Sequence, residues 1–205
     1  MPAKKIVILA NSIKHNKRCV AGKCLATGQW IRPVADATGE ALSFDQLKCR
    51  NPHGIFAVKT LQKVTIEFVT AKPLIHQPEN LLIAANEVWQ QDFKIHQQDL
   101  PRFLDKPISI WGGDSRVSYQ AIVQNLYKPH QSLFLVQTQE LQLYYAADKK
   151  RRVSFKYNGI AYDLPATDPQ FDTIFKEKRK LMGILCISLG EEHHGYCYKI
   201  AAAIY

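Results

Sequence analysis

Two segments of the sequence interleave basic residues with aromatic ones. In the first, Trp30 is followed by Arg32, and in the second a run of four cations precedes Phe155. Lysine and arginine neutralise the phosphates of nucleic acid, and exposed aromatic rings stack on its bases. The pattern therefore predicts a nucleic-acid interface. Its candidate residues are Arg18, Lys23, Trp30, Arg32, Trp111, Arg116, Lys150, Arg151, Arg152 and Lys156.

Strand periodicity decides which of the first group could face solvent. Alternate residues of a strand share a face, so Trp30 and Arg32 lie together, and they point outward if Ile31 is in the core. Outward, they could stack on a base and hold a phosphate. The alternative interpretation is that Trp30 covers one end of a barrel and Arg32 lies over it.

The second group follows the same rule. Arg152 and Lys156 share one face of an expected strand, whereas Phe155 and Tyr157 share the other face with Arg151, and the two rings fit a core better than a stacking platform. The cation run 149–152 has an alternative role as a solvated hairpin end that protects a sheet edge from aggregation. Both interpretations of the run stay open at this point.

A zinc site is the second kind of chemistry to consider. Cys19, Cys24, Cys49 and His53 offer three thiolates and an imidazole, which is a usable ligand set. However, structural zinc favours cysteine pairs two to four residues apart, and Cys19 and Cys24 lie on opposite faces of one expected strand. We therefore predict no metal site.

Catalysis is the third kind of chemistry that the sequence could support. The chain has no nucleophile elbow, metalloprotease motif, P-loop or dinucleotide fingerprint. The turn Gly112–Arg116 could bind a phosphate in a backbone nest, and the loop Glu191–His194 could do acid–base or metal chemistry, but a plain turn and a solvated loop explain them equally simply. An enzyme would need Asp163, Asp168, His193 and Arg116 to converge. We expect no catalytic residue and no cofactor.

The composition describes a folded, basic protein. The chain has 205 residues, 46% of them hydrophobic, and a net charge of +9, which favours polyanionic partners. Residues 1–50 hold nine basic and three acidic residues, and residues 148–182 hold nine and five. Apolar runs are too short for a membrane helix or a signal peptide, and the five cysteines are most simply free thiols. We expect a cytoplasmic protein that does not bind membranes.

Short strands must position these side chains. The run Ile6–Ala10 indicates a buried strand, Asn158-Gly159 indicates a tight hairpin, and Asp168–Leu181 has the capping and spacing of a helix. The helix-compatible stretch Asn86–Leu104 marks a domain boundary. About ten short strands without a βαβ rhythm predict a mainly β fold of two small barrels with a few short helices. The expected parts are a first barrel over 1–88, a linker or helical connection over 89–106 and a second barrel over 107–205.

Four motifs carry a resemblance to a known family. They are RCVAG (Arg18–Gly22), GQWIRPV (Gly28–Val34), QPEN (Gln77–Asn80) and the tail ISLGEEHHGYCYKIAAAIY (Ile187–Tyr205). With these the chain resembles the bacterial dual OB-containing domain family. The resemblance implies two OB-like barrels in tandem, a topology often used for oligonucleotides, oligosaccharides or partner proteins. Glu192, His193 and His194 depart from the family's tail pattern.

Three functional hypotheses follow. The first is binding of single-stranded or structured DNA or RNA by the basic faces of both barrels, without catalysis. The second is a protein-interaction or scaffold module of a bacterial operon or defence system. The third is an enzyme acting on nucleotides or nucleic acid. If the two basic segments share one surface, the first hypothesis gains; if they scatter, the charge serves solubility and the second gains.

Overall fold

The computed structural model describes residues 2–14, 17–85 and 87–205. The chain divides into two compact units, the first made of Met1–Leu74 with Pro78–Phe103 and the second of Ile75–Gln77 with Leu104–Tyr205. Strands dominate both units, and the helices are short. Within the described part of the chain, no helix combines the length and apolarity that crossing a bilayer requires.

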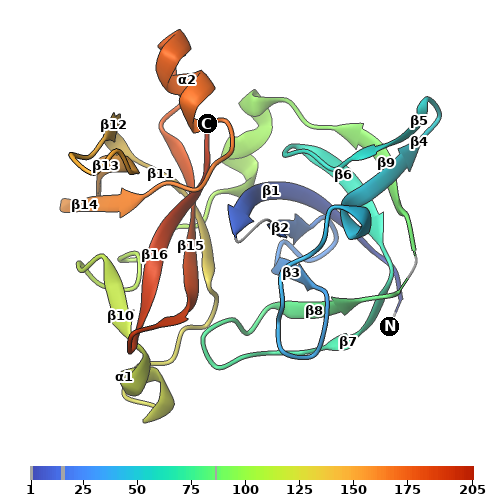
Figure 1. The fold of residues 1–205 in the computed structure, drawn as a ribbon, viewed down its shortest axis with the longest axis horizontal. Helices are drawn as coiled ribbons and strands as arrows, with labels where there is room; N and C mark the ends of the chain where they lie inside the picture. The colour runs from blue at the N-terminus through green and yellow to red at the C-terminus, as the bar shows by residue number, and fades with distance from the viewer. Residues whose placement is uncertain (1, 15–16, 86) are drawn as a thin grey trace. The chain divides into compact units, whose positions relative to one another are not determined.

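The first unit contains one long, curled sheet (Figure 1). Its strand order is β5-β4-β9-β6-β1-β2-β3-β8-β7, and Ile6, Ile8, Val64 and Trp89 are among the buried residues of its core. The expected buried strand at Ile6–Ala10 is confirmed within β1. The elements are β1 (Lys4–Lys14), β2 (Lys17–Cys24), β3 (Trp30–Val34), η1 (Asp45–Leu47), β4 (Lys48–Asn51), β5 (Gly54–Ala57), β6 (Gln62–Ile66), β7 (Phe68–Ala71), β8 (Asn80–Ile83), β9 (Trp89–Lys94) and η2 (Gln97–Phe103).

The second unit contains a four-stranded sheet, β10-β16-β15-β11, and a three-stranded sheet, β12-β13-β14. An isolated parallel bridge between Ala166 and Ala201 links the two sheets. Val153, Phe171 and Leu185 are among the fully buried residues of its core. The elements are β10 (Arg116–Ser118), α1 (Tyr119–Val123), β11 (Leu133–Gln137), β12 (Gln139–Tyr145), β13 (Arg151–Tyr157), β14 (Ile160–Pro165), α2 (Phe171–Glu177), β15 (Ile184–His193) and β16 (Tyr196–Ile204).

Local turn chemistry predicts one hairpin correctly and one helix only in part. Asn158 and Gly159 have φ of 49° and 79° and join β13 to β14, which confirms the hairpin. The helix expected over Asp168–Leu181 is shorter at both ends, because α2 begins at Phe171 with Gln170 in place of Asp168 as N-cap, and it ends before Lys178, whose φ is 47°. Asp168 accepts hydrogen bonds from the backbone N–H groups of Gln170 (2.7 Å) and Ile204 (2.8 Å), and so it ties the preceding turn to β16.

The stretch Asn86–Leu104 contains a strand where the sequence suggested a helix-compatible connection. β9 pairs in parallel with β4 and antiparallel with β6, and Trp89 packs into the core of the first unit. Its glutamine and aspartate content gives little β propensity, so pairing with distant strands decides its structure. Residues 78–103 belong to the first unit.

Gly22 is required by a close approach of two strands. It pairs with Ile8 in β1, beside an irregularity in that strand between Ile8 and Ala10, and with Ile31 in β3. A Cβ atom at position 22 would lie 2.1 Å from the carbonyl oxygen of Val7. The glycine of the RCVAG motif therefore has a structural role.

We predict that Gly22→Ala strongly destabilises the first unit. The new methyl group must displace the backbone of β1, and we expect a loss of more than about 3 kcal/mol in the free energy of unfolding. Gly28→Ala is the matched control, because its Cβ would meet nothing within 4 Å although its φ is +70°; its cost should stay near 1–2 kcal/mol, roughly the left-handed penalty alone. Equal destabilisation in urea titrations would contradict the close-contact explanation.

Candidate nucleic-acid interface

β3 buries the two side chains that alternation was expected to expose. Only 6% of Trp30 and 7% of Arg32 are exposed to solvent, and all five residues of the strand are buried. The prediction that Trp30 and Arg32 point outward is therefore wrong. The strand lies between β2 and β8 in the sheet, so both of its edges are occupied.

The burial of charge around β3 is compensated by partners distant in sequence. Arg32 Nε lies 3.5 Å from Glu79 Oε1, a carboxylate of the QPEN motif. Lys23, which is also buried, donates a hydrogen bond of 2.8 Å to the Phe103 carbonyl and lies 5.2 Å from the centre of the Trp30 ring. These contacts give Lys23, Trp30 and Arg32 a role in holding the first unit together.

Four cations of the second basic segment are ion-paired. Four ion pairs join this segment to carboxylates: Arg151 to Asp172 (2.6 Å), Arg152 to Asp163 (2.8 Å), Lys156 to Glu140 (2.8 Å) and Lys150 to Asp148 (2.8 Å). Each pair cancels locally the positive charge that the sequence counts for the segment. Phe155 and Tyr157 are buried in the core, as their face of β13 predicts.

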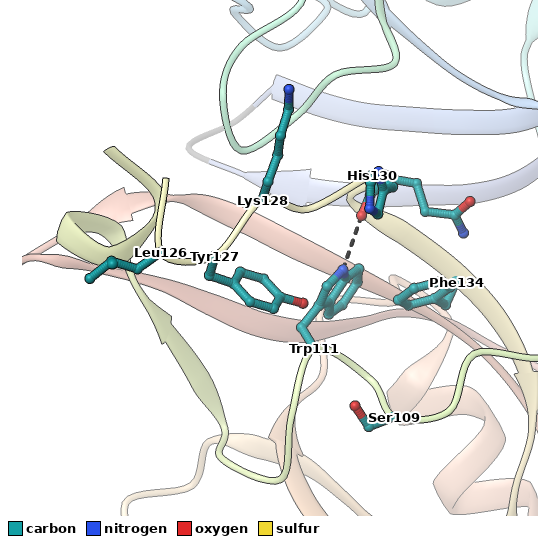
Figure 2. A pocket seen from close by; sticks show the side chains of 8 residues that line it. Ser109, Trp111, Leu126, Tyr127, Lys128, His130 and Phe134 are labelled. Carbon is teal, nitrogen blue, oxygen red and sulfur yellow. Dashed lines mark hydrogen bonds between the residues drawn. The ribbon is translucent and has the colours of Figure 1, made fainter. Parts of the chain in front are cut away.

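Two other candidates lie against aromatic rings. The guanidinium of Arg18 lies 5.4 Å from the ring centre of Phe44, a side chain that is 56% exposed. Trp111 is 6% exposed, and its indole N–H donates to the Gln131 carbonyl at 3.0 Å inside a pocket (Figure 2). Arg18 and Trp111 lie in different units.

Arg116 lies on an exposed sheet surface together with two tyrosines. β10 and β16 run side by side (Figure 1), with Arg116 opposite Tyr198 and Ser118 opposite Tyr196. The Arg116 guanidinium stacks 3.8 Å from the ring centre of Tyr196 and donates a 3.3 Å hydrogen bond to the Tyr198 hydroxyl. We call Arg116, Tyr196 and Tyr198 the tyrosine platform. His193 pairs with Tyr196 at its margin.

The platform is accessible and permanently charged. Arg116 is exposed and both tyrosines are partly exposed, whereas Cys197 between them is buried. A hollow of about 510 Å³ beside it is lined by Asp114, Ser115, Arg116, Ser118 and Tyr196. The hydrogen bond to Tyr198 raises the pKa of Arg116 further, so the guanidinium stays protonated. Such a surface can stack planar groups and attract an anion.

Sequence reasoning missed Tyr196 and Tyr198. The signal was present, because residues 196–200 read Tyr-Cys-Tyr-Lys-Ile, with both tyrosines on one face of a strand. Alternation alone does not show which face of this strand is exposed to solvent. Among the residues that the structure describes, no group of three or more His, Cys, Asp or Glu side chains could hold a metal ion.

Two β-rich units with separate cores place the chain among proteins built from tandem small barrels. A model of the dual OB-containing domain family matches residues 4–204, and the chain belongs to this family. The chain is also similar, with 8% sequence identity and a TM-score of 0.32, to the solved structure described as the tetrameric p202 HIN2, over 100% of this chain and 90% of that one. Curated protein sequences contain no match. The family match over residues 4–204 confirms the expected fold class of two OB-like barrels.

A buried lysine supports the loop that leads into the platform. Lys199 is fully buried, and its ammonium group donates a hydrogen bond of 2.8 Å to the Gly112 carbonyl. The Tyr162 hydroxyl donates to the same carbonyl at 3.0 Å, and Tyr162 also accepts from the Ile110 N–H. Burial lowers the pKa of Lys199 to about 8. The loop before β10 is therefore attached to the core by two side chains.

We predict that Lys199 makes stability depend on pH above 8. Its pKa falls from 10.5 in the unfolded chain to about 8 in the folded one. Below pH 8 the lysine is charged in both the folded and the unfolded state, and the folded state bears the full cost of burying that charge. Between pH 8 and 10.5 the unfolded state holds more protons, and folding stability rises with pH by up to about 3 kcal/mol. The measurement is the difference in unfolding free energy between the unsubstituted protein and Lys199→Met from pH 7 to 10. Lys176→Met, at an exposed site, should give a flat difference; a flat difference for Lys199→Met as well would refute the assignment.

We also predict that Arg32 acts through stability. Arg32→Ala leaves the Glu79 carboxylate buried without its cation and should cost about 3–5 kcal/mol. Arg32→Met combined with Glu79→Leu removes both charges and should cost clearly less than Arg32→Ala. Chemical denaturation of the unsubstituted protein and the two variants measures both costs. A destabilisation by Arg32→Ala below about 1 kcal/mol would show that the pair is not structural.

Proposed function

We propose that this protein binds single-stranded nucleic acid through the tyrosine platform of its second unit. The observation that carries the proposal is the pair of partly exposed tyrosines, two residues apart on β16, with the Arg116 guanidinium stacked on the first. Base stacking on aromatic side chains needs a free ring face, and it accepts every base because each has a π surface. In a duplex the faces of the bases are already stacked on each other, so a single strand fits this surface better.

The geometry supports two adjacent bases. The ring centres of Tyr196 and Tyr198 lie 6.4 Å apart, so neighbouring bases could each contact one ring. The Arg116 guanidinium lies 3.8 Å from the Tyr196 ring centre and 5.8 Å from that of Tyr198, so it covers one face of Tyr196 and could contact a phosphate while it remains stacked. Ser118, opposite Tyr196 in β10, caps α1 by accepting from the Ala121 N–H at 3.3 Å, and its O–H could donate to a sugar or a phosphate.

Fold and charge agree with this proposal. OB-like barrels are used widely for oligonucleotides, and this chain belongs to a family defined by two such barrels. The net charge of +9 favours the approach of a polyanion. Because Lys150, Arg151, Arg152 and Lys156 are ion-paired, we assign long-range attraction to the net charge of the whole chain and close contact to the platform.

A second candidate function, binding of a partner protein, is favoured by strand β5. This strand lies at one end of the first unit's sheet, all four of its residues are exposed, and Ile55 and Phe56 are each 47% exposed. An exposed edge strand with apolar side chains can pair with an extended peptide. Failure of the unsubstituted protein to bind any single strand at low salt would favour this second function.

We predict that the platform tyrosines control strand affinity. Tyr196→Ala and Tyr198→Ala should each weaken binding by roughly 5- to 100-fold, the value of one lost stacking contact. Tyr196→Phe keeps a ring and should bind almost as the unsubstituted protein does. The measurement is fluorescence anisotropy with labelled single-stranded DNA, single-stranded RNA and duplex across a salt series.

Arg116 provides the charge control in the same assay. Arg116→Ala should lower the slope of log affinity against log salt by about 0.7, the value for one phosphate contact on a single strand. Arg102→Ala removes an arginine of the first unit that is 82% exposed and lies 4.0 Å from Asp99, and it should leave the slope unchanged. Binding that is insensitive to salt, or equally affected by both arginine variants, would contradict the platform as the site.

A further inference from the structure

The second unit contains an aromatic pocket that the tyrosine platform does not use. It has a volume of about 450 Å³, and the residues that line it include Ser109, Trp111, Tyr127, Lys128, His130 and Phe134. Figure 2 shows the rings of Tyr127, Trp111 and Phe134 in a row, with Lys128 and His130 on one side of the row and Ser109 on the other. Small-molecule sites are commonly clefts of roughly 300–1,000 Å³ with aromatic walls and a few polar groups.

The backbone around Trp111 is held in an unusual conformation. Trp111 has φ of 50° and Gly112 has φ of 83°, and a bulky residue in the left-handed region is strained. The strain is maintained by fixed partners: the Gly112 N–H donates to Ser109 Oγ at 3.0 Å, and its carbonyl accepts from Lys199 and Tyr162. These hydrogen bonds hold the loop in the conformation that places the indole in the pocket wall.

The pocket's rings suit a flat ligand. The Trp111 and Phe134 ring centres lie 4.6 Å apart with a 36° angle between the planes, and the Trp111 N–H is already bonded to the Gln131 carbonyl. Tyr127 and Phe134 pack against the core but are partly exposed, so a ligand in the pocket could contact the exposed part of each ring. Trp111 forms a rigid part of the pocket wall, and the rings of Tyr127 and Phe134 could contact a planar heteroaromatic group.

The positive charge at the rim of the pocket indicates that a planar ligand would have a negatively charged substituent. Lys128 and His130 are both exposed and come from one loop, and the described residues that line the pocket include no carboxylate. A cation and an imidazole beside an aromatic wall complement a base that carries a phosphate.

We propose that this pocket binds one nucleoside monophosphate unit, with the base against Tyr127, Trp111 and Phe134 and the phosphate at Lys128 and His130. The unit has two sources, a free mononucleotide or the phosphorylated end of a strand. In the second case the proposal rests on the proposed function, because the pocket would hold the end of the strand that the platform binds.

Calorimetric titration with AMP, UMP, adenosine and inorganic phosphate tests the pocket directly. AMP or UMP should bind, and adenosine should bind about tenfold more weakly than AMP because a charge-assisted phosphate contact is lost. Lys128→Ala should remove that tenfold preference and leave adenosine binding unchanged. Tyr127→Leu should weaken AMP and adenosine alike, by at least about fivefold, the lower limit for one stacked base. Lys176→Ala, at an exposed lysine of α2, should change nothing.

Oligonucleotides with and without a terminal phosphate distinguish the two sources. Tighter binding of the phosphorylated strand, lost in Lys128→Ala, identifies the strand end; binding of AMP or UMP without such a preference identifies the free nucleotide. Absence of both effects at millimolar ligand overturns the pocket proposal, even if strands bind. Tyr196→Ala should leave AMP binding unchanged, because the platform is not part of the pocket. If the unsubstituted protein binds AMP but no strand, only the proposed function is overturned.

Discussion

The two-residue repeat of β16 is the constraint on which the second unit depends. One face of this strand places Cys197, Lys199 and Ala201 in the core, and the other presents Tyr196 and Tyr198. β16 pairs with both β10 and β15, and it meets the second sheet at the bridge between Ala166 and Ala201. A shift of one residue would exchange the two faces, exposing the lysine that supports the Gly112 loop and burying the tyrosines.

Much of the fold could be predicted where local chemistry decides it. The Asn158-Gly159 turn and the core positions of Phe155 and Tyr157 follow from turn geometry and strand alternation. β9 could not be predicted, because its polar sequence becomes a strand only by pairing with β4 and β6, which lie far away in the chain. The end of α2 at Lys178 has no glycine to mark it.

The candidate site was less predictable, because the environment of a cation depends on remote residues. Arg32 meets Glu79 across 47 positions and Arg151 meets Asp172 across 21, so counting charge along the sequence overstates the free positive surface. Arg116 is a candidate in the sequence as the cation of the turn Gly112–Arg116, but its significance comes from Tyr196 and Tyr198, which join it only through the β10–β16 pairing. Alternation along β16 is enough to place both tyrosines on one face. The ion pairs of Arg32 and Arg151 could not be predicted from their sequence neighbours, because their carboxylate partners lie far away in the chain.

Photochemical cross-linking of a bromouracil-substituted single strand, followed by mass spectrometry of the digested protein, tests the central claim most directly. The account predicts that the cross-linked peptides centre on Tyr196 and Tyr198, because the bases would stack on these rings. Cross-links concentrated instead on the ion-paired segment 150–157, or on the first unit alone, would contradict the tyrosine platform as the nucleic-acid interface.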